Sequence, residues 1–298
     1  WSMDGTVTFA EWRASRDGKR VAYAVQDGGS DWRTIRVLDV ATGKETSDVV
    51  QWARMTQIAW ANDGSGFYYS RYPEPKPEVS DTTGLINHAI YFHRIGTPQA
   101  DDTLFFATPS KPARVNSAGL TPDGRYMIIY STDDLVHADV SVVDLDQRDQ
   151  SPRTLIENSP DRWSVIGNVG TKLLLKATKG PERSKIVSVD LASSEPVFID
   201  VVPEQDAHLT GAYIVGDRIL AIYFVDVKFE MRRLRLDGSP DGVVKLPGMG
   251  SVHAVSGEPG NREAFILYGS FNQAETVYKY DVETGQLVAW VEPAIGAD

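Results

Sequence analysis

A repeat of about 46 residues runs through the chain and limits its possible folds more than any other feature of the sequence. The clearest copies contain Asp-Gly turns at residues 17–18, 63–64 and 123–124, each followed by a short apolar run that ends near a tyrosine. Weaker copies keep only the glycine. The marker glycines are Gly18, Gly64, Gly124, Gly170, Gly216 and Gly260, so their successive spacings are 46, 60, 46, 46 and 44 residues.

A second marker, an aspartate at the end of an apolar run, stands 20 or 21 residues after the marker glycines. These aspartates are Asp39, Asp144, Asp190, Asp237 and Asp281. Two markers in fixed phase are hard to obtain by chance. The chain is therefore built from six copies of one structural unit.

Each unit is predicted to hold four short antiparallel strands. Glycine allows the positive φ angle of a tight hairpin turn. The runs after it are apolar at consecutive positions, as in residues 219–225, which indicates strands that are buried on both faces. Four-stranded units of this length are typical of propeller blades. We therefore expect an all-β fold, a single β-propeller domain over residues 1–298, with six visible blades at about 1–51, 52–112, 113–162, 163–207, 208–249 and 250–298. A β-sandwich with coincidental turns is the alternative.

The exceptional spacing of 60 residues reflects extra residues between 72 and 84. Three prolines at alternate positions begin this segment, and proline holds the chain extended and donates no backbone hydrogen bond. The segment is predicted to project as a mobile loop. Insertions in repeat proteins often lie on the working face, but a solvated loop without a role fits the composition equally well.

Composition excludes several classes of function. The 30 basic and 41 acidic residues give a net charge of −11 without a basic run, which argues against nucleic acid binding. The chain has no cysteine, which excludes disulfides, thiolate catalysis and Cys-ligated metals. A chain without cysteine suits the cytoplasm and the periplasm equally, so the sequence does not decide the compartment. No apolar run is long enough for a membrane span, so we expect a soluble protein. The chain starts at Trp1, which predicts a processed or truncated amino terminus.

No catalytic centre is visible. The nucleophile elbow G-x-S-x-G of α/β-hydrolases is missing, and the five histidines show no metal-ligand spacing, so neither catalytic nor metal residues nor a cofactor are expected. We interpret His88 and His93 as structural or loop residues. The pairs Asp101-Asp102 and Asp133-Asp134 are interpreted as solvated turns, as is the segment 237–242. Most tryptophans and tyrosines are expected to pack between blades.

Several strings are similar to the propeller of prolyl oligopeptidases. They are residues 2–7 (SMDGTV), 29–35 (GSDWRTI), 66–73 (GFYYSRYP), 87–97 (NHAIYFHRIGT) and 120–126 (LTPDGRY). The resemblance extends along the whole chain and is strongest over residues 1–135. It implies a seven-bladed propeller joined to an α/β-hydrolase peptidase domain with a Ser, Asp and His triad that cleaves oligopeptides after proline. The propeller of such enzymes caps the active site and excludes large folded substrates.

The same resemblance implies site residues. Phe67 or Tyr69, Val115 and Thr132 would face the substrate, with Val115 and Thr132 in place of a methionine and an arginine of some relatives. The access loop at the domain interface would contain Tyr72, Pro73, Pro75, Pro77, Asp81 and His88.

Two departures from the family pattern remain. Six units are present instead of seven, which implies a first blade upstream of Trp1, and the peptidase domain would follow Asp298. A blade face is then exposed at each end and favours association. The expected partners are this peptidase domain and proline-containing oligopeptides. The alternatives are a free-standing propeller that scaffolds protein partners, and a lactonase-like propeller enzyme, which the scattered histidines disfavour.

Overall fold

The structure is a computed structural model that describes residues 5–74, 85–134, 136–178, 183–291 and 293. In this part of the chain the regular elements are strands and one short 3-10 helix, η1 (Gln99–Asp101). The strands are β1 (Val7–Ala14), β2 (Arg20–Asp27), β3 (Arg33–Asp39), β4 (Lys44–Ala53), β5 (Ala59–Trp60), β6 (Gly66–Arg71), β7 (Ala89–Arg94), β8 (Thr103–Phe106), β9 (Val115–Leu120), β10 (Tyr126–Thr132), β11 (Ala138–Asp144), β12 (Arg153–Ile156), β13 (Arg162–Val169), β14 (Lys172–Thr178), β15 (Lys185–Asp190), β16 (Phe198–Val202), β17 (His208–Val215), β18 (Arg218–Val225), β19 (Lys228–Arg235), β20 (Pro240–Val244), β21 (Ser251–Gly257), β22 (Glu263–Ser270), β23 (Gln273–Asp281) and β24 (Leu287–Val291).

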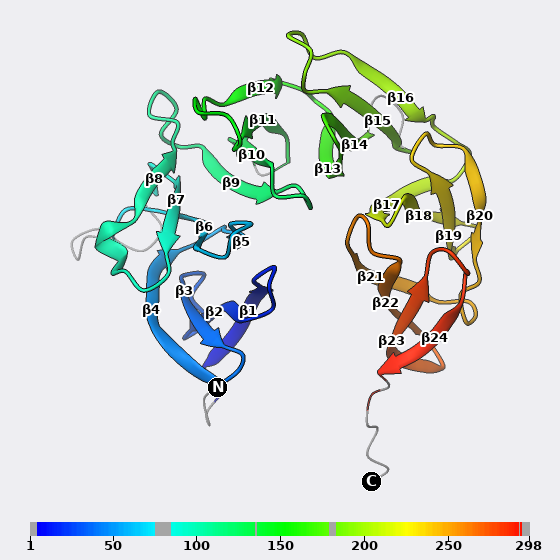
Figure 1. The fold of residues 1–298 in the computed structure, drawn as a ribbon, viewed down its shortest axis with the longest axis horizontal. Coiled ribbons are helices and arrows are strands. Elements are labelled where there is room, and N and C mark those ends of the chain that lie inside the picture. Colours follow the sequence, from blue (N-terminus) through cyan, green and yellow to red (C-terminus); the bar gives the residue numbers. More distant parts are fainter. Residues whose placement is uncertain (1–4, 75–84, 135, 179–182, 292, 294–298) are drawn as a thin grey trace. The chain divides into compact units, whose positions relative to one another are not determined.

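The strands form antiparallel sheets in which neighbours in sequence are neighbours in space (Figure 1). Strands β9–β12, β13–β16, β17–β20 and β21–β24 each make a four-stranded sheet. Strands β1–β8 form one larger sheet, but its two halves are joined only through the pair Ala53 and Arg71. The predicted all-β propeller fold with six four-stranded blades is confirmed.

The marker glycines sit in the turns between the first and second strands. Gly18, Gly64 and Gly124 have φ angles of 68°, 68° and 75°, which a residue with a Cβ atom adopts at a cost. The apolar run after each of the six glycines forms the second strand of its sheet, β2, β6, β10, β14, β18 and β22. These strands hold much of the buried core of their sheets, with runs of buried side chains such as those of β10 and β18.

Each sheet has two distinct ends. We call the end with the connection from the first to the second strand the turn end, and the end with the connection from the second to the third strand the loop end. Because the strands alternate in direction, the fourth strand also finishes at the loop end, where the chain crosses to the next sheet.

Two compact units make up the chain, residues 1–160 and residues 161–298. In the first unit, a core cluster that includes Ile35, Trp60 and Phe67 fills the space between β1–β4 and β5–β8. The turn ends are tied together, because Arg16 donates hydrogen bonds to Asn62 (2.9 Å) and to the carbonyl of Pro122 (2.5 Å). The loop ends of these three sheets therefore lie at the same side of the unit.

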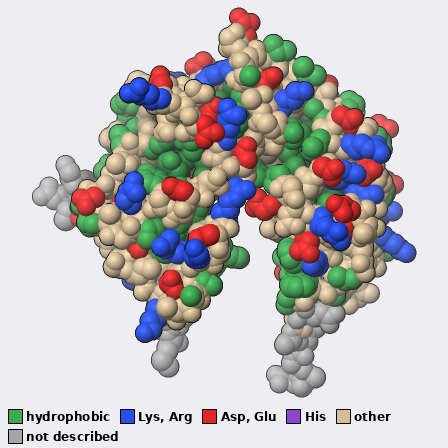
Figure 2. Space-filling model, viewed as in Figure 1, with side chains coloured by type: hydrophobic (Ala, Val, Ile, Leu, Met, Phe, Trp, Pro, Cys, Tyr) green, Lys and Arg blue, Asp and Glu red, His purple; other side chains and the backbone are tan. Residues whose placement is uncertain are grey.

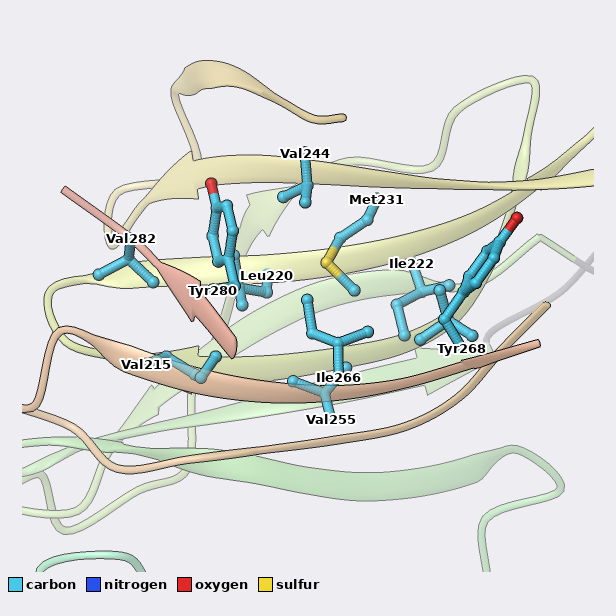
Figure 3. Packing of buried hydrophobic residues seen from close by; sticks show 12 residues of the cluster. Val215, Leu220, Ile222, Met231, Val244, Val255, Ile266, Tyr268, Tyr280 and Val282 are labelled. Atoms are coloured by element: carbon cyan, nitrogen blue, oxygen red, sulfur yellow. The ribbon is translucent and has the colours of Figure 1, made fainter. Parts of the chain in front are cut away.

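In the second unit, the sheets β17–β20 and β21–β24 enclose a core of aliphatic and aromatic residues. Figure 3 shows Ile222, Met231 and Ile266 pointing toward one another, with Tyr268 and Tyr280 to either side. Acidic and basic side chains are interspersed on the visible face of this unit (Figure 2).

Large apolar residues remain exposed on the first and the last sheet. On β1, Phe9 and Trp12 are 42% and 55% exposed, and on β24 Trp290 is 58% exposed. Trp290 stacks edge-on against Phe265 within its own sheet. No helix in the described part of the chain is long and apolar enough to cross a membrane.

Candidate functional site

The candidate site lies at the loop end of the first unit, where the proline-rich segment leaves β6 and returns to β7. Pro75, Pro77 and Asp81 lie outside the described residues. The flanking residues Tyr72 and His88 are only 5% and 1% exposed, and their rings are 4.5 Å apart. Pro73 is exposed. The segment is therefore anchored at both ends by buried aromatic rings.

His88 is held by two hydrogen bonds that define its protonation. Its Nδ1 accepts from the backbone N–H of Asn116 (2.9 Å), so its Nε2 carries the proton and donates to the carbonyl of Arg54 (2.8 Å). Burial is the main cause that lowers the pKa of His88. The neutral imidazole of His88 thus links three segments of the chain. They are the loop after β4, the start of β7 and the start of β9.

Asn116 completes this connection and has no exposed surface. Its side-chain amide donates to the carbonyl of His88 (2.7 Å) and to the hydroxyl of Thr108 (3.0 Å), and its oxygen accepts from Ser131 (2.7 Å). Every polar group of this side chain is paired, as burial requires. The position of His88 is therefore specified by the third sheet as well as by its own.

At the other end of the proline-rich segment, Tyr72 contacts the loop between β2 and β3. The ring of Trp32 packs edge-on against Tyr72 at 6.1 Å, and the guanidinium of Arg54 lies 5.5 Å from the centre of the Trp32 ring. Arg54 also pairs with Asp31 at 2.7 Å. Burial is the main cause that raises the pKa of Tyr72, so its hydroxyl stays protonated.

The structure brings two predicted substrate-facing residues together. Val115 and Thr132 are directly opposite each other on β9 and β10, both half-buried. The hydroxyl of Thr132 donates to the carbonyl of His137 (2.7 Å) within the β10–β11 connection. Next to this pair, the buried guanidinium of Arg114 binds the carboxylates of Asp133 (3.0 Å) and Asp139 (2.5 Å).

The other two predicted residues lie in the core. Phe67 and Tyr69 are 0% and 1% exposed, and the ring of Phe67 contacts that of His93 at 5.2 Å. In this arrangement they have no surface to offer a peptide, and their substrate-facing role stays a prediction.

A buried polar network behind the site was not predicted. Nδ1 and Nε2 of His93 lie 2.7 Å from Asp102 and 3.2 Å from Asp48, and all three side chains have 1% or less exposed surface. The hydroxyl of Tyr69 donates to the second oxygen of Asp102 (2.7 Å). The interpretation of Asp101-Asp102 as a solvated turn is therefore wrong for Asp102, because the turn after η1 directs its carboxylate into the core.

The charges of this network support one another. Burial by itself would lower the pKa of His93, but hydrogen bonds and charge from Asp102 and Asp48 outweigh it, so the pKa is raised. Burial acts to raise the pKa of Asp48, and hydrogen bonds from Thr46, the N–H of Gly96 and His93 lower it overall. An imidazolium between two carboxylates thus fastens β4 to β7 and η1.

The described residues of the site show no reaction centre. Its histidines are buried and their nitrogens are occupied. Among the residues that the structure describes, no three acidic or histidine side chains are placed to hold a metal ion. The exposed pair Asp133 and Asp134 lies in the β10–β11 connection, as the sequence predicted.

The comparisons with known proteins agree with this architecture. The sequence model of the prolyl oligopeptidase N-terminal beta-propeller domain matches residues 1–293. The chain belongs to this family. The chain is 28% identical to the prolyl endopeptidase of Elizabethkingia meningoseptica, over 99% of its own length and 42% of the relative's. It is also 28% identical to the prolyl oligopeptidase ophP of Omphalotus olearius, over 94% of its length and 40% of the relative's.

Solved structures show the same relationship. One of two prolyl endopeptidases analysed for inter-domain dynamics in catalysis and specificity is 37% identical, with a TM-score of 0.88 over 97% of this chain and 42% of that one. Prolyl oligopeptidase B from Galerina marginata, bound to a 35mer hydrolysis and macrocyclization substrate, is 25% identical, also with a TM-score of 0.88. It is covered over 43% of its length. The chain thus spans less than half of the relatives that it matches.

Proposed function

We propose that this chain is the non-catalytic part of a proline-specific serine oligopeptidase, where it caps the active site and admits only small peptides. The match of the family model to residues 1–293 carries this proposal, together with relatives that continue well beyond the matched part. The chain forms one propeller domain in this proposal, and its partner is the α/β-hydrolase peptidase domain of the same protein.

The loop end of the first unit would contribute to substrate selection. Val115 and Thr132 present an aliphatic and a small polar side chain at the half-buried start of β9 and end of β10. These groups suit an uncharged oligopeptide. The anchored segment between Tyr72 and His88 would act as the access loop, since its ends are fixed in the core while Pro73 is exposed.

The test compares two substrates of the full-length gene product. A short proline-containing peptide and the same sequence placed within a folded protein are incubated with it, and cleavage is followed by mass spectrometry. We expect cleavage after proline in the peptide alone. Equal cleavage of both substrates would contradict the filtering role, and cleavage of neither would contradict the peptidase assignment.

A second measurement separates the chain from its parent. The 298-residue chain by itself should not react with a fluorophosphonate probe, because it has no nucleophile elbow. Stoichiometric labelling would show that it carries a nucleophile of its own. A free-standing scaffold, the alternative, would give no labelling and no peptidase activity in the full-length product.

A further inference from the structure

Strand β4 contains a bulge just before Ala53, where the pair with Arg71 joins the two halves of the first sheet. The two residues of β4 between Val50 and Ala53 face the single residue Thr34 of β3. A bulge of this kind interrupts the ladder of backbone hydrogen bonds and bends the strand, and bulges are frequent next to functional sites. The bend sets the direction in which the chain leaves β4 toward the candidate site.

The carboxamide of Gln99, the first residue of η1, pairs with the backbone of this bulge. Its Oε1 accepts from the backbone N–H of Gln51 (2.9 Å), and its Nε2 donates to the carbonyl of Gln51 (3.0 Å). One side chain thus makes both hydrogen bonds that a residue of a neighbouring strand would make. We call this pairing the carboxamide clamp. Nε2 of Gln99 also donates to the hydroxyl of Tyr69 (3.3 Å), so the clamp is continuous with the buried network.

The backbone directly after the clamp is strained. Trp52 and Met55 have φ angles of 58° and 49°, in the left-handed region that bulky side chains adopt at a cost. Strain of this kind persists only where the surrounding structure holds it, and it gathers near binding sites. The clamp fixes the residue before Trp52 and therefore helps to hold this shape.

The strained segment leads to the residue that anchors His88. The carbonyl of Arg54, two residues after Trp52, accepts from Nε2 of His88 (2.8 Å). The guanidinium of Arg54 pairs with Asp31 (2.7 Å) in the loop between β2 and β3. A shift of the backbone at the bulge would move this carbonyl away from the imidazole ring. The clamp therefore acts on the anchor of the access loop.

We propose that Gln99 is a positioning residue of the candidate site, an inference that rests on the proposed function. Its carboxamide holds the bulge of β4, the bulge sets the carbonyl of Arg54, and this carbonyl fixes the ring of His88. Gln99 acts on the access loop through these contacts. The reacting groups would lie in the peptidase part, so loss of the clamp should weaken peptide binding and leave the reaction step intact.

The variant Gln99→Met in the full-length gene product removes the clamp and keeps the length of the side chain. With the short proline-containing peptide as substrate, we expect KM to rise about 5-fold and kcat to change less than about 2-fold. Gln150→Met is the matched control, because Gln150 is exposed between β11 and β12 at the turn end, where its Nε2 donates to the carbonyl of Leu145 (3.1 Å). An unchanged KM for Gln99→Met would overturn the inference.

The variant Gln99→Glu gives a pH profile that a general loss of stability would not produce. A protonated carboxyl group can donate to the carbonyl of Gln51 and accept from its N–H, as the carboxamide does, whereas an ionised one can only accept. The KM of this variant relative to the unaltered protein should therefore fall toward one as the pH is lowered. The same ratio for Gln99→Met should stay constant. A ratio for Gln99→Glu that does not change with pH would contradict the clamp.

Hydrogen exchange tests the path to the anchor without any need for activity. The N–H of Asn116, which donates to Nδ1 of His88 (2.9 Å), should exchange roughly 10-fold faster in Gln99→Met than in Gln150→Met, as measured by mass spectrometry. Equal exchange in the two variants would refute the path from Gln99 to His88. Cleavage after proline with an unchanged KM in Gln99→Met would refute the positioning role alone, whereas absence of cleavage by the unaltered full-length product would refute the proposed function.

Discussion

Replacement of His93 by glutamine should destabilise the first unit strongly. The imidazolium lies 2.7 Å from Asp102 and 3.2 Å from Asp48, and none of the three side chains has more than 1% exposed surface. The variant leaves two buried carboxylates without a cation between them. Removal of one partner from a buried ion pair costs about 3–5 kcal/mol, and we expect a loss of unfolding free energy in this range.

The loss should depend on pH in a defined direction. The pKa of His93 is raised above its ordinary value of 6.5, so its contribution is fully present below pH 6.5 and is lost as the pH rises through the folded-state pKa. The pKa of Asp48 is lowered from 3.8, so its contribution is present above pH 3.8 and is lost as the pH falls through its folded-state pKa. The difference in unfolding free energy between the unaltered chain and His93→Gln should therefore be greatest between pH 3.8 and pH 6.5 and shrink toward alkaline pH.

Urea unfolding at a series of pH values measures this difference. His253→Gln is the matched control, because the side chain of His253 is 43% exposed and its Nε2 lies 3.7 Å from Glu275, farther than the carboxylates lie from His93. Exposed substitutions of this kind usually change stability by less than about 0.5 kcal/mol. A loss below about 1 kcal/mol for His93→Gln, or a difference that grows toward alkaline pH, would refute the assignment of a charged, buried network.

Three further perturbations test other parts of the structure. Gly66→Ala would place a Cβ atom against the backbone of β7, so the free energy of unfolding in urea should fall by about 1–3 kcal/mol. Gly119→Ala, which has open space around its Cβ position, is the control and should cost much less. Equal losses in the two variants would contradict the packing. His88→Phe leaves a buried carbonyl and a buried N–H unpaired and should cost about 1–3 kcal/mol for each, and an unchanged urea midpoint would exclude the anchoring role. The 298-residue chain should self-associate through its uncovered end sheets, and Trp12→Ser with Trp290→Ser should reduce this in sedimentation velocity; a monodisperse monomer before substitution would contradict it.

The fold could be predicted because the repeat is local. A turn with positive φ needs glycine, and the strand after it needs apolar residues, so Gly18, Gly64 and Gly124 mark their sheets within a few residues of sequence. The same holds for the weaker copies at Gly170 and Gly216. The sequence signal and the structural requirement lie in the same short segment.

The buried network could not be predicted, because its members come from three separate segments. Asp48 and His93 stand on β4 and β7, and Asp102 follows η1. Only the packing of one half-sheet against the next brings them together. The sequence of Asp101-Asp102 looks like that of any exposed turn. The short helix η1 turns the carboxylate of Asp102 inward and that of Asp101 outward, and no sequence pattern marks it.

The site was predicted in part. The pairing of Val115 with Thr132 follows from strand register, and resemblance to relatives indicated both residues. Resemblance also indicated Phe67 or Tyr69; alternation on β6 turns both toward the core, and their substrate-facing role stays a prediction.

The sequence of the gene beyond residue 298 and upstream of residue 1 tests most directly whether this chain caps the active site of an oligopeptidase. We expect a further propeller blade upstream and, downstream, a peptidase part with a G-x-S-x-G elbow followed by its Asp and His. A stop codon directly after residue 298, with no peptidase part encoded, would contradict the claim that this chain caps the active site of an oligopeptidase.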